Sequence, residues 1–169
     1  RQAKGTAIVN LLQLGPNEKI ATLLAIDEKD DNKYLLLATK NGIVKKTDRE
    51  EFKNINKAGL IAIGLREDDE LIGVKVTDGN KDVLLVTKEG MSIRFDENDI
   101  RSMGRSAMGV KGITLSNDDK VVSMSLCEEG TDVLVVSENG FGKRTDINEY
   151  RTQIRAGKGI KTYNIAEKT

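Results

Sequence analysis

The sequence Tyr34-Leu-Leu-Leu-Ala-Thr-Lys-Asn-Gly42-Ile-Val-Lys-Lys-Thr-Asp48 occurs three times in this chain, with changes, and it decides the fold. The second copy is Asp82-Val-Leu-Leu-Val-Thr-Lys-Glu-Gly90-Met-Ser-Ile-Arg-Phe-Asp96, and the third is Asp132-Val-Leu-Val-Val-Ser-Glu-Asn-Gly140-Phe-Gly-Lys-Arg-Thr-Asp146. Their glycines are 48 and 50 residues apart, and ten residues after each glycine stands Phe52, Ile100 or Tyr150. Copies at nearly constant spacing indicate an array of repeated structural units.

Each copy is typical of a β-hairpin. Its apolar runs are short, rich in Val, Ile and Leu, and bounded by Gly, Asn and Asp, which favours strands over helices. The Asn41-Gly42 and Asn139-Gly140 pairs favour hairpin turns, because both residue types tolerate positive φ. Two further apolar elements recur between the hairpins: one at 20–26, 71–76 and 121–126, the other at 8–14, 60–65, 110–115 and, incompletely, 160–165.

One repeat therefore contains about four short strands and no long helix. Four strands in every 48 to 50 residues is the period of a propeller-like array of antiparallel blades. We predict an all-β fold of three blades and part of a fourth, with repeats at about 1–52, 53–100, 101–150 and 151–169. The alternative is a single β-sandwich, which does not need recurring motifs.

Composition excludes several function classes. The 169 residues form about one domain, without histidine or tryptophan and with a single cysteine, Cys127. Disulfides, clustered Cys/His metal sites and catalysis by an imidazole base are thereby excluded. We expect no catalytic site, metal site or cofactor site on this chain. No apolar stretch is long enough to cross a membrane and no leader is evident, so a cytoplasmic protein is expected.

The charges are segregated although they balance. Lysine plus arginine and aspartate plus glutamate each number 27. Residues 40–57 carry a net charge of +3, residues 58–82 carry −3, and the sign continues to alternate with the repeat. Because a radial array brings equivalent positions to equivalent places, we predict one continuous basic band and one acidic band.

The basic band suits a polyanion, because each phosphate that Lys or Arg neutralises releases condensed counterions. Aromatic residues are few, which disfavours stacking on single-stranded bases and favours duplex DNA bound through its phosphate backbone. The alternative is an ordinary solvated surface. In each repeat the basic residues follow the glycine turn and run into the next repeat, and Lys53 and Lys161 belong to these stretches. We expect the band to lie past the hairpin turns, outside the core, and to consist of Lys45, Lys46, Lys57, Arg94, Arg101, Arg105, Lys111, Lys143, Arg144, Arg151, Arg155 and Lys158.

Several strings in the chain resemble a known family. They include Lys4-Gly5-Thr-Ala-Ile-Val-Asn10, Asn41-Gly-Ile-Val-Lys-Lys-Thr47, Arg101-Ser-Met-Gly-Arg105 and Asn139-Gly-Phe-Gly-Lys-Arg-Thr145. Over essentially its whole length the chain is similar to the C-terminal domain of the DNA gyrase A subunit. The resemblance implies a β-pinwheel, a propeller-like disk of six blades whose basic rim binds and bends duplex DNA.

The resemblance also implies a parent enzyme, a bacterial type II topoisomerase that introduces negative supercoils with ATP. Its DNA-cleaving tyrosine and its ATPase, with their ATP and Mg²⁺, lie outside this domain. The implied partners are duplex DNA, the gyrase B subunit and the rest of the gyrase A subunit, in the cytoplasm near the nucleoid and away from membranes.

The chain departs from the family in one motif. The gyrase box, a glutamine and two arginines followed by Gly-Gly-Lys-Gly, is absent, and Arg155-Ala-Gly-Lys158-Gly159 repeats only its second half. The related topoisomerase IV A subunit has a similar domain without the box and is the nearest alternative. Outside the family, the alternatives are a propeller-type protein-interaction module that uses the acidic band, and an enzyme.

Overall fold

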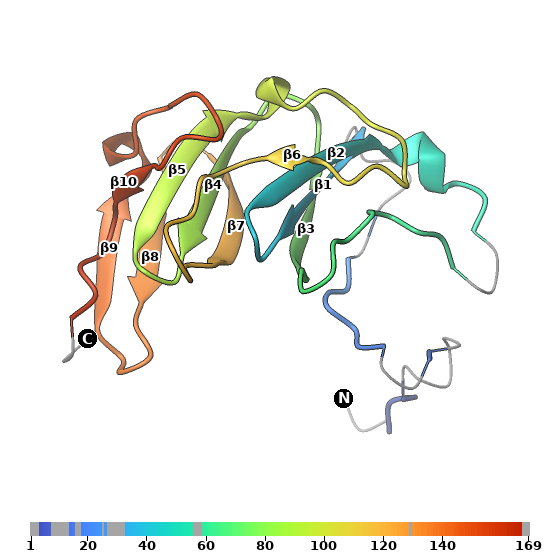
Figure 1. The fold of residues 1–169 in the computed structure, drawn as a ribbon, viewed down its shortest axis with the longest axis horizontal. Coiled ribbons are helices and arrows are strands. Elements are labelled where there is room, and N and C mark those ends of the chain that lie inside the picture. The colour runs from blue at the N-terminus through green and yellow to red at the C-terminus, as the bar shows by residue number, and fades with distance from the viewer. Residues whose placement is uncertain are drawn as a thin grey trace.

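The computed structural model describes residues 4–7, 14–15, 18–24, 26, 33–55, 59–128 and 130–166, and it shows an arc of β-sheets (Figure 1). Within these residues there is no helix long and apolar enough to cross a membrane. The predicted all-β fold is confirmed. The strands are β1 (Tyr34–Thr39), β2 (Ile43–Asp48), β3 (Leu71–Thr77), β4 (Asp82–Thr87), β5 (Met91–Asp96), β6 (Val110–Lys111), β7 (Val121–Cys127), β8 (Asp132–Val136), β9 (Gly142–Asp146) and β10 (Ile160–Lys161).

The strands form three antiparallel sheets, ordered β3-β1-β2-β6, β10-β5-β4-β7 and β8-β9. Each four-stranded sheet is built around one hairpin. Its last strand comes from a later segment that follows the next hairpin, which we call a connection, since β6 pairs with β2 and β10 pairs with β5. Residues 160–161 therefore belong to the sheet of the second hairpin. In the described residues the third blade consists of its hairpin alone.

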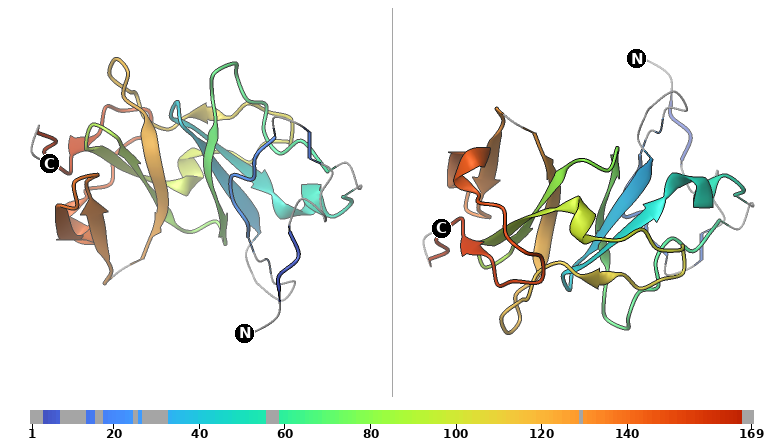
Figure 2. Two further views of the ribbon diagram at one scale, coloured as in Figure 1. Left: turned by 90° about the horizontal axis from the view of Figure 1, so that it is seen from below. Right: turned by 90° about the horizontal axis from the view of Figure 1, so that it is seen from above.

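Short 3-10 turns follow the three hairpins: η2 (Arg49–Phe52), η3 (Glu97–Asp99) and η4 (Ile147–Glu149). The preceding aspartate caps each turn, because its side-chain oxygen accepts a hydrogen bond from the backbone N–H two residues later. The chain then runs along the convex edge of the arc, which we call the rim (Figures 1 and 2).

The first two sheets share one hydrophobic core. Leu36, Val83, Leu85 and Phe95 are completely buried in it, and β3 of the first sheet lies beside β7 of the second. The strands β1 and β4 are covered on both faces, which explains their nearly continuous apolar sequences. The third hairpin contributes much less to this core, because alternate side chains of β8 are exposed.

The hairpin turns are confirmed, with one difference in their geometry. The first two loops contain three residues and the third contains five. The glycine, but not Asn41 or Asn139, has positive φ, +81° at Gly42 and +82° at Gly140. The carbonyl oxygens of Gly42 and Gly90 accept hydrogen bonds from the backbone N–H groups of Gly112, at 2.8 Å, and Thr162, at 2.9 Å. A later connection thus docks on the first two glycine turns.

This docking predicts different effects of alanine at equivalent glycines. In Gly90→Ala, the new Cβ would lie 2.2 Å from the carbonyl oxygen of Tyr163, whereas at Gly140 nothing lies within 4 Å. Both substitutions incur the strain of positive φ, about 1 to 2 kcal/mol, and Gly90→Ala adds the clash. Urea denaturation should therefore show a larger loss of unfolding free energy for Gly90→Ala. Equal losses would show that the docked connection simply moves aside.

Candidate nucleic-acid interface

The chain places a cation on the rim just past each 3-10 turn, immediately after η2 and two residues after the last residue of η3 and of η4. Lys53, Arg101 and Arg151 occupy this position in the three repeats, and all three are exposed. Arg101 and Arg151 each follow a buried apolar residue, here called the anchor. The anchors are Ile100, at 0% exposure, and Tyr150, at 3%. The apolar anchor points inward, so the next side chain points to solvent.

Hydrogen bonds to the hairpin fix the backbone on the other side of these cations. Ser102 forms a parallel β-bridge with Lys46, and the N–H of Met103 donates to the carbonyl oxygen of Lys46 at 2.9 Å. The equivalent bridge in the next blade joins Thr152 to Arg94. These contacts hold Arg101 and Arg151 at equivalent positions on the rim.

Farther along the second and third connections, an arginine contacts the preceding repeat. The Arg155 guanidinium donates to the carbonyl oxygens of Asp99 in η3, at 3.0 Å, and of Lys111 in β6, at 2.8 Å. Its equivalent, Arg105, lies 4.0 Å from the carboxylate of Glu51. Both arginines are half-buried. They lie on the rim as predicted, but Arg155 also has a structural role.

The expectation that Lys45 and Lys46 lie outside the core is wrong, because both side chains are buried and only 0% and 5% exposed. The Lys46 ammonium donates to the carbonyl oxygen of Glu97 at 3.0 Å. The Lys45 ammonium donates to the carbonyl oxygens of Ala62, at 2.7 Å, and of Arg105. Burial lowers the pKa of Lys45, and the charge of Arg105 lowers it further. These lysines join neighbouring connections and are not available to phosphates.

The prediction for Arg94 needs the same correction. Its Nε lies 2.7 Å from the carboxylate of Asp82, and Nη1 donates to the carbonyl oxygens of Ile147 and Tyr150 in the next repeat. The side chain is 18% exposed. Arg144 holds the equivalent place and forms the equivalent ion pair with Asp132, yet it remains 76% exposed.

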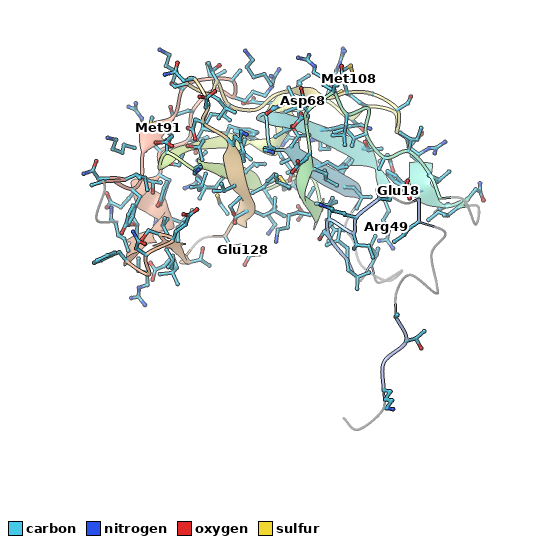
Figure 3. All side chains as sticks on the ribbon, turned by 60° about the horizontal axis from the view of Figure 1, so that its bottom comes forward. Glu18, Arg49, Asp68, Met91, Met108 and Glu128 are labelled. Atoms are coloured by element: carbon cyan, nitrogen blue, oxygen red, sulfur yellow. The ribbon has the colours of Figure 1, made fainter. Side chains whose placement is uncertain are left out.

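The remaining predicted residues are either exposed or outside the described residues. Lys143 and Arg144 are exposed on β9, and Lys57 lies outside the described residues. Nitrogen-tipped side chains project from the convex edge in Figure 3. We call the exposed cations of the connections the rim cations: Lys53, Arg101, Lys111, Arg151, Lys158 and Lys161.

The acidic turns serve mainly to hold the hairpins. Asp69 and Asp119 are only 9% and 7% exposed. Each uses one carboxylate oxygen to accept two backbone N–H groups, those of Asn41 and Glu70 for Asp69, and those of Glu89 and Lys120 for Asp119. The predicted acidic band therefore lacks two of its carboxylates as free surface groups.

The single thiol gives a pH-dependent prediction. Burial raises the pKa of Cys127 to about 11. The positive charge of Arg94 lowers this pKa in part, and the negative charge of Asp82 raises it. At pH 8 the thiolate fraction should be ~100-fold below that of an ordinary cysteine, since one pKa unit is tenfold in ionisation. Alkylation by iodoacetamide should therefore be slow in the native protein and fast in urea. Equal rates in both would contradict the burial of this thiol.

Repeated four-stranded sheets joined by interlocking connections, with a recurring cation on the convex edge, define a propeller-like domain with a basic rim. A family model described as "DNA gyrase C-terminal domain, beta-propeller" matches residues 33–78, 81–128 and 131–168. This match covers well over half of the sequence. The chain belongs to the DNA gyrase C-terminal domain family.

Individual relatives agree with this assignment. The chain is 56% identical over 112 residues to the DNA gyrase A subunit of Clostridium acetobutylicum, and 55% identical over 114 residues to that of Halalkalibacterium halodurans. These matches cover 66% and 68% of this chain but only 14% of either relative. The chain thus corresponds to a small part of those proteins.

Solved structures show the same architecture. A DNA gyrase A C-terminal domain matches with a TM-score of 0.87 at 30% identity, over 99% of this chain and 56% of that chain. The C-terminal domain of a DNA topoisomerase IV matches with a TM-score of 0.86 at 32% identity, over 93% of this chain and 49% of that one. The β-pinwheel predicted from the resemblance is confirmed.

Proposed function

We propose that the rim binds duplex DNA through its phosphate backbone and bends it along the arc. One observation carries the proposal: Lys53, Arg101 and Arg151 occupy the same exposed place in three successive repeats. Exposed cations that recur along a convex edge can neutralise successive phosphates of a duplex that follows this edge. Phosphate contacts of this kind position the duplex without reading its sequence.

The aromatic side chains favour duplex over single-stranded DNA. Phe95 and Tyr150 are buried, and Phe141 alone is exposed among the three Phe and three Tyr, all of which the structure describes. Phe141 directly follows Gly140 of the third hairpin turn. This turn joins β8 and β9 at the end of the two strands that lies away from the rim (Figure 1). Binding of single strands relies on stacking platforms, which the described part of this rim lacks.

The salt dependence of binding tests the proposal. If the six rim cations each neutralise one phosphate, the logarithm of the association constant should fall with the logarithm of the salt concentration at a slope of about −5. Filter binding of linear duplexes of unrelated sequence, over a salt series, measures this slope. A slope near zero would contradict DNA binding at the rim, and a strong dependence on base sequence would contradict backbone recognition.

Bending has its own measurement. Curving 20 to 30 base pairs by 40 to 90° costs on the order of 1 to 6 kcal/mol, so contacts to several blades are needed to hold the bend. We expect a short duplex that carries a fluorescent donor and acceptor at its two ends to show increased energy transfer when this protein binds, because bending brings the ends together. Unchanged energy transfer, together with normal binding, would show that the rim binds DNA without bending it.

We further propose that the chain serves as this domain of a DNA gyrase A subunit in the bacterial cytoplasm. The curated relatives at 55 to 56% identity carry that name, which favours gyrase over topoisomerase IV. In this proposal the DNA-cleaving and ATP-hydrolysing steps, with their Mg²⁺ and the gyrase B subunit, belong to other parts of the enzyme. The chain contributes DNA binding and needs no cofactor.

A protein-interaction module is the second candidate. It would use the acidic turns as its binding surface. Asp69 and Asp119 are buried and hold the hairpin backbone, which leaves the acidic turns with fewer free carboxylates than the sequence suggests. Among the rim cations, Lys53 forms an exposed ion pair with Glu50 at 2.5 Å, and Lys161 donates to Asn164 at 3.4 Å. Both partners are only three residues away in the sequence, and neither contact holds a hairpin, so the basic surface is favoured as the functional one.

A further inference from the structure

Arg155 joins two connections of the rim. Its Nε donates to the carbonyl oxygen of Asp99, and its Nη1 donates to that of Lys111. Asp99 ends η3 and Lys111 ends β6, so the two residues mark the beginning and the end of the connection that carries Arg101. In the view from above, the connection of Arg155 runs beside this one (Figure 2). One side chain thus spans the base of the neighbouring connection.

The two carbonyl groups belong to peptides that are also held on their other side. The N–H of Ile100 donates to the carbonyl oxygen of Glu97 at 3.0 Å, and the N–H of Gly112 donates to that of Gly42 at 2.8 Å. These bonds fix the two peptides to their own blade, and Arg155 fixes them to the next connection. Hydrogen bonds from a charged donor are about twice as strong as those between neutral groups. Arg155 therefore restricts the rotation of both peptides.

The backbone around Arg155 is itself fixed. The N–H of Gln153 donates to the carbonyl oxygen of Arg94 at 2.7 Å, and the N–H of Ala156 donates to that of Gly112, also at 2.7 Å. The guanidinium group therefore extends from a backbone that is bound on both sides.

Arg105, the equivalent residue of the preceding connection, makes a different contact. Its Nε lies 4.0 Å from the carboxylate of Glu51, which is the repeat equivalent of Asp99. The two side chains are 35% and 51% exposed, and exposed ion pairs contribute little. In the part of the chain that the structure describes, Arg155 binds backbone carbonyl oxygens of the preceding repeat and Arg105 does not.

Two rim cations lie at the ends of the span that Arg155 closes. Arg101 comes two residues after Asp99, and Lys111 supplies one of the bound carbonyl oxygens itself. Both side chains are exposed. Two cations contact phosphates of one duplex most tightly when their backbone is already fixed, because less conformational freedom is then lost on binding.

We propose that Arg155 is a positioning residue of the rim, which holds Arg101 and Lys111 in place to contact the same duplex. This inference rests on the proposed function, since it concerns the phosphate contacts of the rim. Arg155 acts through the backbone of its two neighbours and not through its own charge. The loss of its hydrogen bonds should therefore weaken DNA binding even when the positive charge is retained.

Arg155→Lys tests this expectation, because it keeps the charge and replaces the planar guanidinium by a compact ammonium. If Arg101 and Lys111 lose their phosphate contacts, the salt slope should become less steep by about 2, and binding at 0.1 M salt should fall by ~60-fold. The matched control is Arg105→Lys, which should bind DNA like the wild-type chain. Filter binding over a salt series measures the effect, and circular dichroism checks that each variant is folded.

A double-mutant cycle separates positioning from other roles. In a chain that already carries Arg101→Gln and Lys111→Gln, Arg155→Lys should cause no further loss of DNA binding, because the contacts that it positions are gone. If Arg155 contacted a phosphate itself, or only stabilised the fold, the fold-loss would be the same in both backgrounds. That result would overturn the proposal, as would wild-type binding by Arg155→Lys.

A measurement on the wild-type chain does not depend on the folding of any variant. Arginines are modified with phenylglyoxal in the presence and absence of duplex DNA, and the products are located by mass spectrometry. DNA should protect Arg101 and leave the reactivity of Arg155 unchanged, and equal protection of both would overturn the proposal. A wild-type salt slope near zero would contradict the proposed function and this inference with it. A normal wild-type slope that Arg155→Lys leaves unchanged would contradict only the inference.

Discussion

Arg94→Ala is expected to lower the free energy of unfolding by about 3 kcal/mol, the range found when one partner of a buried ion pair is removed. The substitution leaves the Asp82 carboxylate with only the Thr152 hydroxyl as a side-chain donor among the described residues. It also removes the guanidinium donor from the carbonyl oxygens of Tyr150 and Ile147, of which Ile147 keeps the N–H of Tyr150. Urea denaturation followed by circular dichroism measures the loss.

Arg144→Ala is the matched control. It removes the same residue type from the same place in the repeat, and the same type of ion pair, but from a side chain that is 76% exposed. Exposed ion pairs contribute about 0 to 1 kcal/mol, so a small effect is expected. Similar losses in both variants would show that the bonds of Arg94 to the next repeat do not hold the blades together.

The combined replacement of Lys53, Arg101 and Arg151 by glutamine should have the largest effect on DNA binding. Removing three phosphate contacts should make the salt slope less steep by about 3 and weaken binding at 0.1 M salt by ~500-fold. Stability should change little, because these side chains are exposed. Filter binding across a salt series gives both quantities.

Three other exposed lysines form the control: Lys75, Lys88 and Lys120. Lys88 and Lys120 lie at the glycine-turn end of the second blade, where the N–H of Lys88 donates to the carbonyl oxygen of Lys120. Their replacement by glutamine removes the same charge from outside the rim. If it weakens binding as much, then overall charge, and not the rim, attracts DNA.

Much of this architecture could be predicted from the sequence because its causes are local. The spacing of Gly42, Gly90 and Gly140 predicts the repeats, and short β-branched runs predict the strands. The position of Arg101 and Arg151 directly after a buried anchor could also be predicted, since Ile100 and Tyr150 are equivalent apolar residues in a polar stretch.

The burial of Lys45 and Lys46 could not be predicted in the same way, because the groups that cover them come from distant connections. Ala62 and Arg105 reach Lys45 only after the blades have assembled. A signal was nevertheless present, since the second repeat has Ile93 at the position of Lys45. An aliphatic equivalent indicates that this position faces the interior.

The exchange of strands between repeats determines how the arc carries mechanical load. Because β6 and β10 belong at once to a rim connection and to a preceding sheet, force applied to Lys111 or Lys161 passes directly into a four-stranded hydrogen-bond ladder. In the proposed function, a bent duplex tends to straighten and would pull outward on the cations that contact it. Lys111 and Lys161 stand on strands, so the four-stranded sheets would resist this pull.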